Sequence, residues 1–185
     1  MRQTCLDRRF STCPESRAKS VNVPNLRFVV DANVLIEAAN KYYTFDRVPG
    51  FWDWMMLQCT TGVVQSVSPV VEEISFPPEL VDWVRELERT NSFIDISEPV
   101  IQSQFSRMAA WLTEQDYGAA HIAKFCDGAD LWIVAVAKLR NAIAVTQETM
   151  PGPGTKKVKL PDICERMDVE WIDTFGMLDA LSASF

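Results

Sequence analysis

The sequence predicts an α/β protein in which helices cover both faces of a central parallel sheet. Three observations support this prediction. Short apolar runs rich in β-branched residues alternate with longer helical patterns, turn residues separate them, and 185 residues suffice for one sizeable core. Alternating strands and helices favour parallel pairing, because each crossover helix returns the chain to the same edge of the sheet. We therefore expect a three-layer α/β/α domain.

The alternation begins at residue 26. Residues 26–30 (LRFVV) predict the first strand, and residues 33–40 predict a helix directly after it. A second helix is expected at residues 50–59, because the segment 60–62 (TTG) then stops it. The apolar run at residues 63–67 predicts the second strand.

Proline marks the next elements. Ser68 as N-cap, with Pro69 at the first helical position, predicts a helix as far as Ile74. Pro77-Pro78 breaks that helix, and residues 79–89 resume as an amphipathic helix. Its apolar residues at helical spacing are Leu80, Trp83, Val84 and Leu87.

The second half of the chain continues the pattern up to and beyond a Pro/Gly loop at residues 151–154. Strands are expected at residues 93–96, 142–145 and 169–172. Helices are expected at residues 99–115, 119–125, 129–140, 161–167 and 174–181. No repeat is visible, so we expect residues 26–185 to form one domain.

Residues 1–25 differ from the rest in charge. They carry five basic and two acidic groups, whereas the remainder carries 13 basic and 23 acidic groups. The segment lacks periodic apolar residues, so we interpret it as a flexible basic N-terminal extension. A basic RNA-contacting arm and an organelle-targeting peptide are the alternatives.

Composition restricts the class of protein. The longest apolar runs, such as residues 131–137, fall short of the ~20 residues that a membrane-spanning helix needs, so we expect a soluble, cytoplasmic protein without a membrane partner. Five scattered cysteines without a CxxC pair argue against a disulfide framework and a zinc site. The net charge of −7 means that RNA binding requires a local basic patch or bound cations.

Carboxylates follow or precede the expected elements in four regions. Asp31 follows the first strand, Glu72 and Glu73 follow the second, Asp130 opens the helix at 129–140, and Glu148 comes after the fourth strand. The carboxyl ends of parallel strands meet at one edge, where ligands usually bind. Clustered carboxylates are ligands for Mg²⁺ or Mn²⁺, and such ions activate water for attack on a phosphodiester.

Each of these acids also has a structural interpretation. Asp31 can cap the following helix, Asp130 can be a first-turn acid that the helix dipole favours, and Glu72 or Glu73 can simply face solvent. His121, the only histidine, lies among apolar residues and fits a structural role better than a catalytic one.

Other residues have possible roles in RNA binding. Lys156, Lys157 and Lys159 follow the Pro/Gly loop and either hold phosphates or form a solvated loop. Most tryptophans fall in apolar patterns, and Trp52 and Trp54 are the better candidates for stacking on bases.

The string FVVDANVLI at residues 28–36 resembles the opening of PIN-domain proteins, a hydrophobic strand followed by Asp-x-Asn/Ser/Thr-x-Leu-Ile. The resemblance continues with Glu73 before an aliphatic residue, Asp130 before an Ala-rich helix, and the Thr-x-acid motif at residues 146–148. Order and spacing agree from about residue 27 to 175.

Residues 40–54 are similar to a bacterial PIN subgroup akin to the VapC toxins. The resemblance implies a PIN-like α/β/α nuclease domain over residues 26–185 that is an Mg²⁺- or Mn²⁺-dependent endoribonuclease. It also implies a toxin that hydrolyses RNA through metal-activated water and has an antitoxin protein as partner.

The resemblance also implies roles for individual residues. Asp31 is the central metal ligand, Glu73 and Asp130 complete the first metal site, and Glu148 binds a second ion or its water. Asn33 and Thr146 orient carboxylates or waters. The family more commonly has Asp where Glu148 stands, which leaves the role of this residue open.

Two other functions remain open. The acidic net charge, and the presence of Glu148 where the family more commonly has Asp, fit a catalytically silent PIN-like binding module. A metal-dependent phosphatase or DNA nuclease would use the same carboxylate chemistry on another phosphoester. The RNA target, the antitoxin and the oligomeric state, including a homodimer, do not follow from the sequence.

Overall fold

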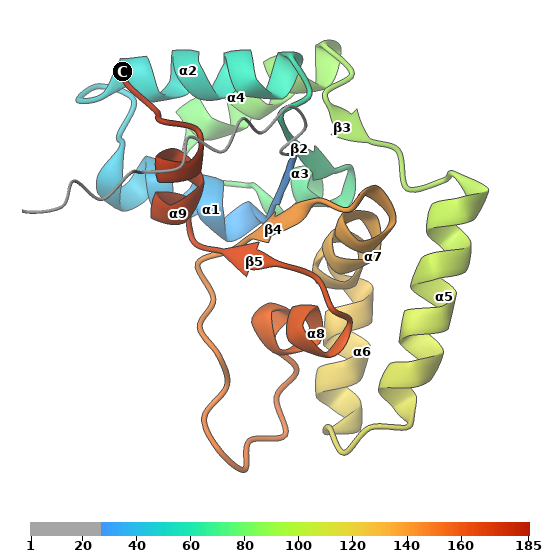
Figure 1. Cartoon of the computed structure of the whole chain (residues 1–185). Helices are drawn as coiled ribbons and strands as arrows, with labels where there is room; N and C mark the ends of the chain where they lie inside the picture. Colours follow the sequence, from blue (N-terminus) through green and yellow to red (C-terminus); the bar gives the residue numbers. More distant parts are fainter. Residues whose placement is uncertain (1–26) are drawn as a thin grey trace, which may run out of the picture.

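The computed structural model describes residues 27–185, so the extension predicted at residues 1–25 lies outside the described residues. The strands of the described chain are β1 (Phe28–Val30), β2 (Val64–Val67), β3 (Phe93–Ile94), β4 (Ile143–Val145) and β5 (Trp171–Ile172). They form one sheet in the order β3-β2-β1-β4-β5, and every pairing is parallel (Figure 1).

The helices fill the connections between these strands. They are α1 (Ala32–Glu37), the π-helical turn η1 (Ala38–Tyr42), α2 (Pro49–Thr60), α3 (Pro69–Glu73), α4 (Pro78–Arg89), α5 (Pro99–Thr113), α6 (Ala119–Asp127), α7 (Asp130–Arg140), α8 (Leu160–Arg166) and α9 (Thr174–Ala180). Figure 1 shows α2, α4 and α9 on one side of the sheet and α5 to α8 on the other. The predicted three-layer α/β/α class with a central parallel sheet is confirmed.

Helix α7 is the central helix of its layer. It packs against β1, β2 and β4 and is flanked by α5, α6 and α8. Its fully buried side chains are Leu131, Ile133, Val134, Ala135 and Val136. Burial of each Val, Leu or Ile side chain contributes roughly 1.5–3 kcal/mol, so this helix is held firmly and its first residue, Asp130, has a defined place.

Chain order reverses at β1, the middle strand. Strands β2 and β3 extend the sheet on one side of it, and β4 and β5 extend it on the other. Phe28 pairs with Ile143 and Val30 with Val145, so Asp31 and Thr146 leave the sheet side by side. Ligand crevices of open parallel sheets form at such a reversal, outside the carboxyl ends of the strands.

Some element ends differ from the prediction. Ser68 occupies the N-cap position and α3 begins at Pro69, as predicted, but the Ser68 side chain makes no capping hydrogen bond. Strand β3 ends at Ile94 because the Asp95 carboxylate accepts hydrogen bonds from the backbone N–H (2.8 Å) and the hydroxyl (2.7 Å) of Ser97, which turns the chain.

Cys59, Cys126 and Cys164 are free thiols, and burial raises the pKa of Cys59 and Cys164 to about 12. Within residues 27–185, no helix has the length and apolar character that crossing a membrane requires.

Candidate active site

Asp31 is the most enclosed of the four predicted acids. It follows β1 and is only 3% exposed, because α1 begins at the next residue and turns the chain back over the sheet. The Thr146 hydroxyl, which is fully buried after β4, donates a hydrogen bond to Asp31 Oδ2 at 2.8 Å. Asp31 lies at the N-cap position of α1 but makes no side-chain capping bond, so capping does not explain it.

Asn33 joins the same network. Its Nδ2 donates to the Asp31 carboxylate and to Thr146 Oγ1 at 3.1 Å, and its Oδ1 accepts from the Gln147 backbone N–H at 2.8 Å. Asn33 and Thr146 therefore hold the Asp31 carboxylate between β1 and β4. The role that the resemblance implies for these two residues, orienting carboxylates or waters of a metal site, stays a prediction.

Glu73 is the acid of the Glu72-Glu73 pair that faces the site. It is the last residue of α3, and its Oε1 accepts a hydrogen bond from the Ala129 backbone N–H at 2.8 Å. A Cβ on Gly128 would lie 3.1 Å from this oxygen, so glycine leaves the space that the carboxylate uses. Glu73 thus reaches the start of α7, directly before Asp130.

The charges of Glu73 and Glu148 influence both Asp31 and Asp130. Burial raises the pKa of Asp31 to about 6, the Thr146 bond opposes this rise, and the charges of Glu73 and Glu148 add to it. Burial likewise raises the pKa of Asp130 to about 8, and the charges of Asp31, Glu148 and Glu73 add to it. Acids with raised pKa values in a cluster are typical of functional sites.

Glu148 is in a different environment, because both of its oxygens have partners. Oε1 lies 2.9 Å from Lys159 Nζ, and Oε2 accepts from the Leu160 backbone N–H at 2.9 Å. Its own backbone N–H donates to Thr146 Oγ1 at 3.1 Å. Glu148 therefore links the end of β4 to the start of α8.

A pocket opens beside these acids. Asp130 and Glu148 line it together with four cationic or titratable side chains, which are His121, Lys124, Lys157 and Lys159. Lys156 forms an ion pair with Asp116 and does not line this pocket. A phosphate at the acids would therefore lie near positive charge despite the net negative charge of the chain.

Sequence reasoning missed part of this pocket wall. His121 is exposed and lines the pocket, and its role stays a prediction. Lys124 and Phe125 were not singled out, although they lie three and four residues after His121 and so share its helix face. This spacing was the signal that could have found them.

The chemistry of the donor set fits a hard divalent cation, since the acids offer only oxygen. Within residues 27–185, however, no three His, Cys, Asp or Glu side chains are arranged to hold a metal ion. The carboxylates of Glu73 and Glu148 turn instead to their backbone and lysine partners. Glu73 is exposed, and it gives up one hydrogen bond, about 1 kcal/mol, if it turns toward Asp31 and Asp130.

Comparison with known families decides where the chain belongs. A family described as "Domain of unknown function (DUF4411)" matches residues 28–185. The chain belongs to this family. A search of curated proteins finds no match. Among solved structures, the crystal structure of FitAcB from Neisseria gonorrhoeae is similar at 15% identity and a TM-score of 0.46, over 78% of this chain and 96% of that one.

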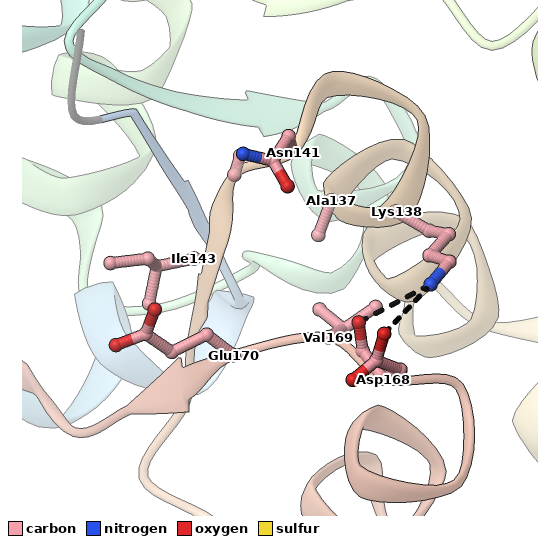
Figure 2. Close-up of a pocket in the computed structure, with 8 residues that line it drawn as sticks. Ala137, Lys138, Asn141, Ile143, Asp168, Val169 and Glu170 are labelled. Carbon is pink, nitrogen blue, oxygen red and sulfur yellow. Dashed lines mark hydrogen bonds and ion pairs between the residues drawn. The ribbon is translucent and has the colours of Figure 1, made fainter.

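The DUF4411 domain has another pocket, at the opposite edge of the sheet (Figure 2). It lies at the amino ends of β4 and β5, where Lys138 Nζ is 3.6 Å from an Asp168 carboxylate oxygen and 3.3 Å from the Asp168 carbonyl oxygen. None of the predicted site residues lines it, and one of its two carboxylates is paired with lysine. This pocket is therefore not the candidate active site.

The aromatic residues of the DUF4411 domain correct one expectation. Trp52 is 3% exposed, stacks on Phe45 with ring centroids 4.0 Å apart, and donates its N–H to the Tyr43 carbonyl at 2.6 Å. It has no free face for a base, so the stacking role predicted for it is wrong. Trp54 is half-buried against the same core.

The buried Thr146 hydroxyl permits a direct test of the network. We expect Thr146→Val to lower the free energy of unfolding by about 1–3 kcal/mol, because it removes one of the two side-chain donors to the buried Asp31 carboxylate. Urea unfolding measures the effect. Thr113→Val is the matched control, because Thr113 is exposed and bonds only to its own helix. Equal losses in the two variants would contradict the role assigned to Thr146.

Proposed function

We propose that this protein is a metal-dependent endoribonuclease that hydrolyses RNA phosphodiester bonds. The observation that supports the proposal is the placement of four carboxylates from four chain segments at the sheet reversal, where two of them have pKa values raised to about 6 and 8. Such acids repel one another unless a cation joins them. The PIN-like motifs of the sequence support the same reaction.

In this proposal Asp31, Glu73 and Asp130 hold Mg²⁺ or Mn²⁺. The ion supplies activation of water and stabilisation of negative charge on the phosphate. Asn33 and Thr146 keep the Asp31 carboxylate in a single orientation. Lys124 and Lys157, which line the pocket beside Asp130, bind phosphates of the RNA chain on either side of the cleaved bond.

The VapC-like resemblance supports a biological role as well. We propose that the protein acts in the cytoplasm as the toxin of a toxin-antitoxin pair and that its partner is an antitoxin protein. Loss of growth on expression, and recovery of growth on co-expression of an antitoxin protein, are the outcomes expected of such a pair.

The purified full-length chain tests the reaction directly. We expect cleavage of single-stranded RNA with Mn²⁺, no cleavage with EDTA, and much slower reaction on single-stranded DNA and p-nitrophenyl phosphate. Faster hydrolysis of DNA or of the small phosphate ester would instead identify a DNA nuclease or a phosphatase. Absence of cleavage of all three substrates under conditions where Mn²⁺ binds would remove the proposal.

One observation favours a second candidate function. The Glu148 carboxylate is already paired with Lys159 and accepts a hydrogen bond from the Leu160 N–H, as expected of a site that has lost catalysis and serves as a binding module. Calorimetry separates the two functions, because a silent module takes up no divalent cation.

A further inference from the structure

The loop that joins β4 to α8 borders another cavity besides the pocket at Asp130. This cavity has a volume of about 450 Å³, which is in the range of sites that hold small organic ligands. Lys156 lines it, and the next residue, Lys157, lines the pocket at Asp130, so both hollows adjoin the same short segment. Tyr117, Asp162 and Arg166 are also part of its wall, and we call it the Tyr117 cavity.

A buried carboxylate organises the wall of this cavity. Asp162, in the first turn of α8, is only 9% exposed. The Tyr117 hydroxyl donates to its Oδ2, and Arg166 Nε donates to its Oδ1 at 3.0 Å. The guanidinium carbon of Arg166 lies 5.6 Å from the centroid of the Tyr117 ring. Asp162 therefore holds an aromatic ring and a guanidinium group against each other at the cavity.

The charges of the Tyr117 cavity are balanced. Among residues 27–185, the cationic side chains that line it are Lys156 and Arg166, and they form ion pairs with Asp116 and Asp162. The pocket at Asp130 differs, because three lysines line it beside two acids. A phosphate would gain more from the three lysines, whereas an uncharged planar ring fits the balanced cavity. Aromatic rings and guanidinium planes are surfaces on which the bases of single-stranded RNA stack.

We propose that the Tyr117 cavity binds a nucleobase of single-stranded RNA, which stacks on the Arg166–Tyr117 pair while a neighbouring phosphate lies at Lys124 and Lys157. The inference rests on the proposed function for RNA as the ligand, and it requires no metal ion. Asp162 is a positioning residue, because it acts through Tyr117 and Arg166. Side chains that are already held in place lose little conformational entropy when a base stacks on them.

Binding in EDTA tests the cavity separately from cleavage. The probes are a single-stranded RNA of about four nucleotides and an abasic strand with the same phosphates and the same dye, measured by fluorescence anisotropy. Because both strands carry equal charge, the ratio of their two Kd values reports contacts to the bases. We expect the wild type to bind the RNA about tenfold more tightly than the abasic strand, as stacking of one base would give.

Variants of the cavity wall assign this ratio to the two stacking side chains. Arg166→Gln and Tyr117→Leu are each expected to lower the ratio to about twofold or less, because each removes one of the two planar groups. Arg85→Gln is the matched control and should keep the ratio, since Arg85 is an exposed helical arginine that pairs with Asp82 on α4. Tyr117→Phe should also keep most of the ratio, because it retains the ring.

The remaining outcomes decide the inference as well. A ratio near one in the wild type, or an unchanged ratio in Arg166→Gln with an unchanged circular dichroism spectrum, would overturn it and leave the proposed function standing. Arg166 is about half exposed, so this variant serves if Tyr117→Leu does not fold. A tenfold ratio in a protein that cleaves no RNA with Mn²⁺ would keep the nucleobase site and remove the proposed nuclease.

Discussion

Replacement of Asp31 by Asn is expected to lower Mn²⁺-dependent RNA cleavage by about 1000-fold or more, the largest effect of any single change in the proposed site. Asp31 is 3% exposed and both Asn33 and Thr146 donate to it, so no other acid can move into its place. The amide keeps the shape of the side chain but removes the charge that binds the ion. Single-turnover cleavage measures the loss of activity, and Mn²⁺ calorimetry on the same samples measures the loss of ion binding.

The same change should not unfold the protein. The raised pKa of Asp31 shows that burial disfavours its charge, so we expect Asp31→Asn to melt at the same or a higher temperature than the metal-free wild type. Asp53→Asn, an exposed substitution on α2, is the matched control for loss of a carboxylate. Asp31→Asn that cleaves RNA within about twofold of the wild type would refute the role assigned to Asp31.

The second expected result is that the metal-free protein loses stability as pH rises from about 5 to about 8.5. The folded-state pKa values of Asp31 and Asp130 are about 6 and about 8, against 3.8 for an ordinary aspartate. Over this window the folded chain binds more protons than the unfolded chain, so stability falls with pH until both acids are ionised. The melting temperature in EDTA should fall by several degrees over this pH window, on the order of 5 °C.

Two controls attribute this fall to the site. In Asp130→Asn, the melting temperature should depend less on pH between about pH 6 and 8. In Asp53→Asn, its dependence on pH should be the same as in the wild type. Saturating Mn²⁺ should restore the melting temperature at pH 8.5, because an ion that binds only the folded chain stabilises it by mass action. A metal-free melting temperature that rises with pH across this window would contradict the shared environment of the two acids.

The general position of the site was predictable from sequence because it depends on chain direction alone. Residues 28–30 and 143–145 are short apolar runs, and an acid or a threonine follows each of them. All parallel strands end at one edge, so Asp31 and Thr146 had to emerge together once the strands were identified. Local patterns also placed Asp130, since α7 begins where the apolar helix pattern begins.

Side-chain partners could not be predicted in this way, because they depend on contacts between distant segments. The choice of Glu73 over Glu72 rests on the Ala129 N–H, 56 residues further along, and on the space that Gly128 leaves. The burial of Trp52 depends on Phe45 folding back over it. Periodicity states which face of an element a residue occupies and says nothing about what covers that face.

Asp31 and Glu148 show the difference between what local sequence patterns predict and what tertiary contacts decide. An α/β chain with Asp31 at the end of its first strand follows from the amino-acid pattern alone, because strand pattern and strand direction are local properties. The packed structure was needed to show that Asp31 is a buried acid held by Asn33 and Thr146, and that Glu148 is held by Lys159 and Leu160. Burial and charge pairing arise when separate segments pack together, and they decide which carboxylates remain available for a cation.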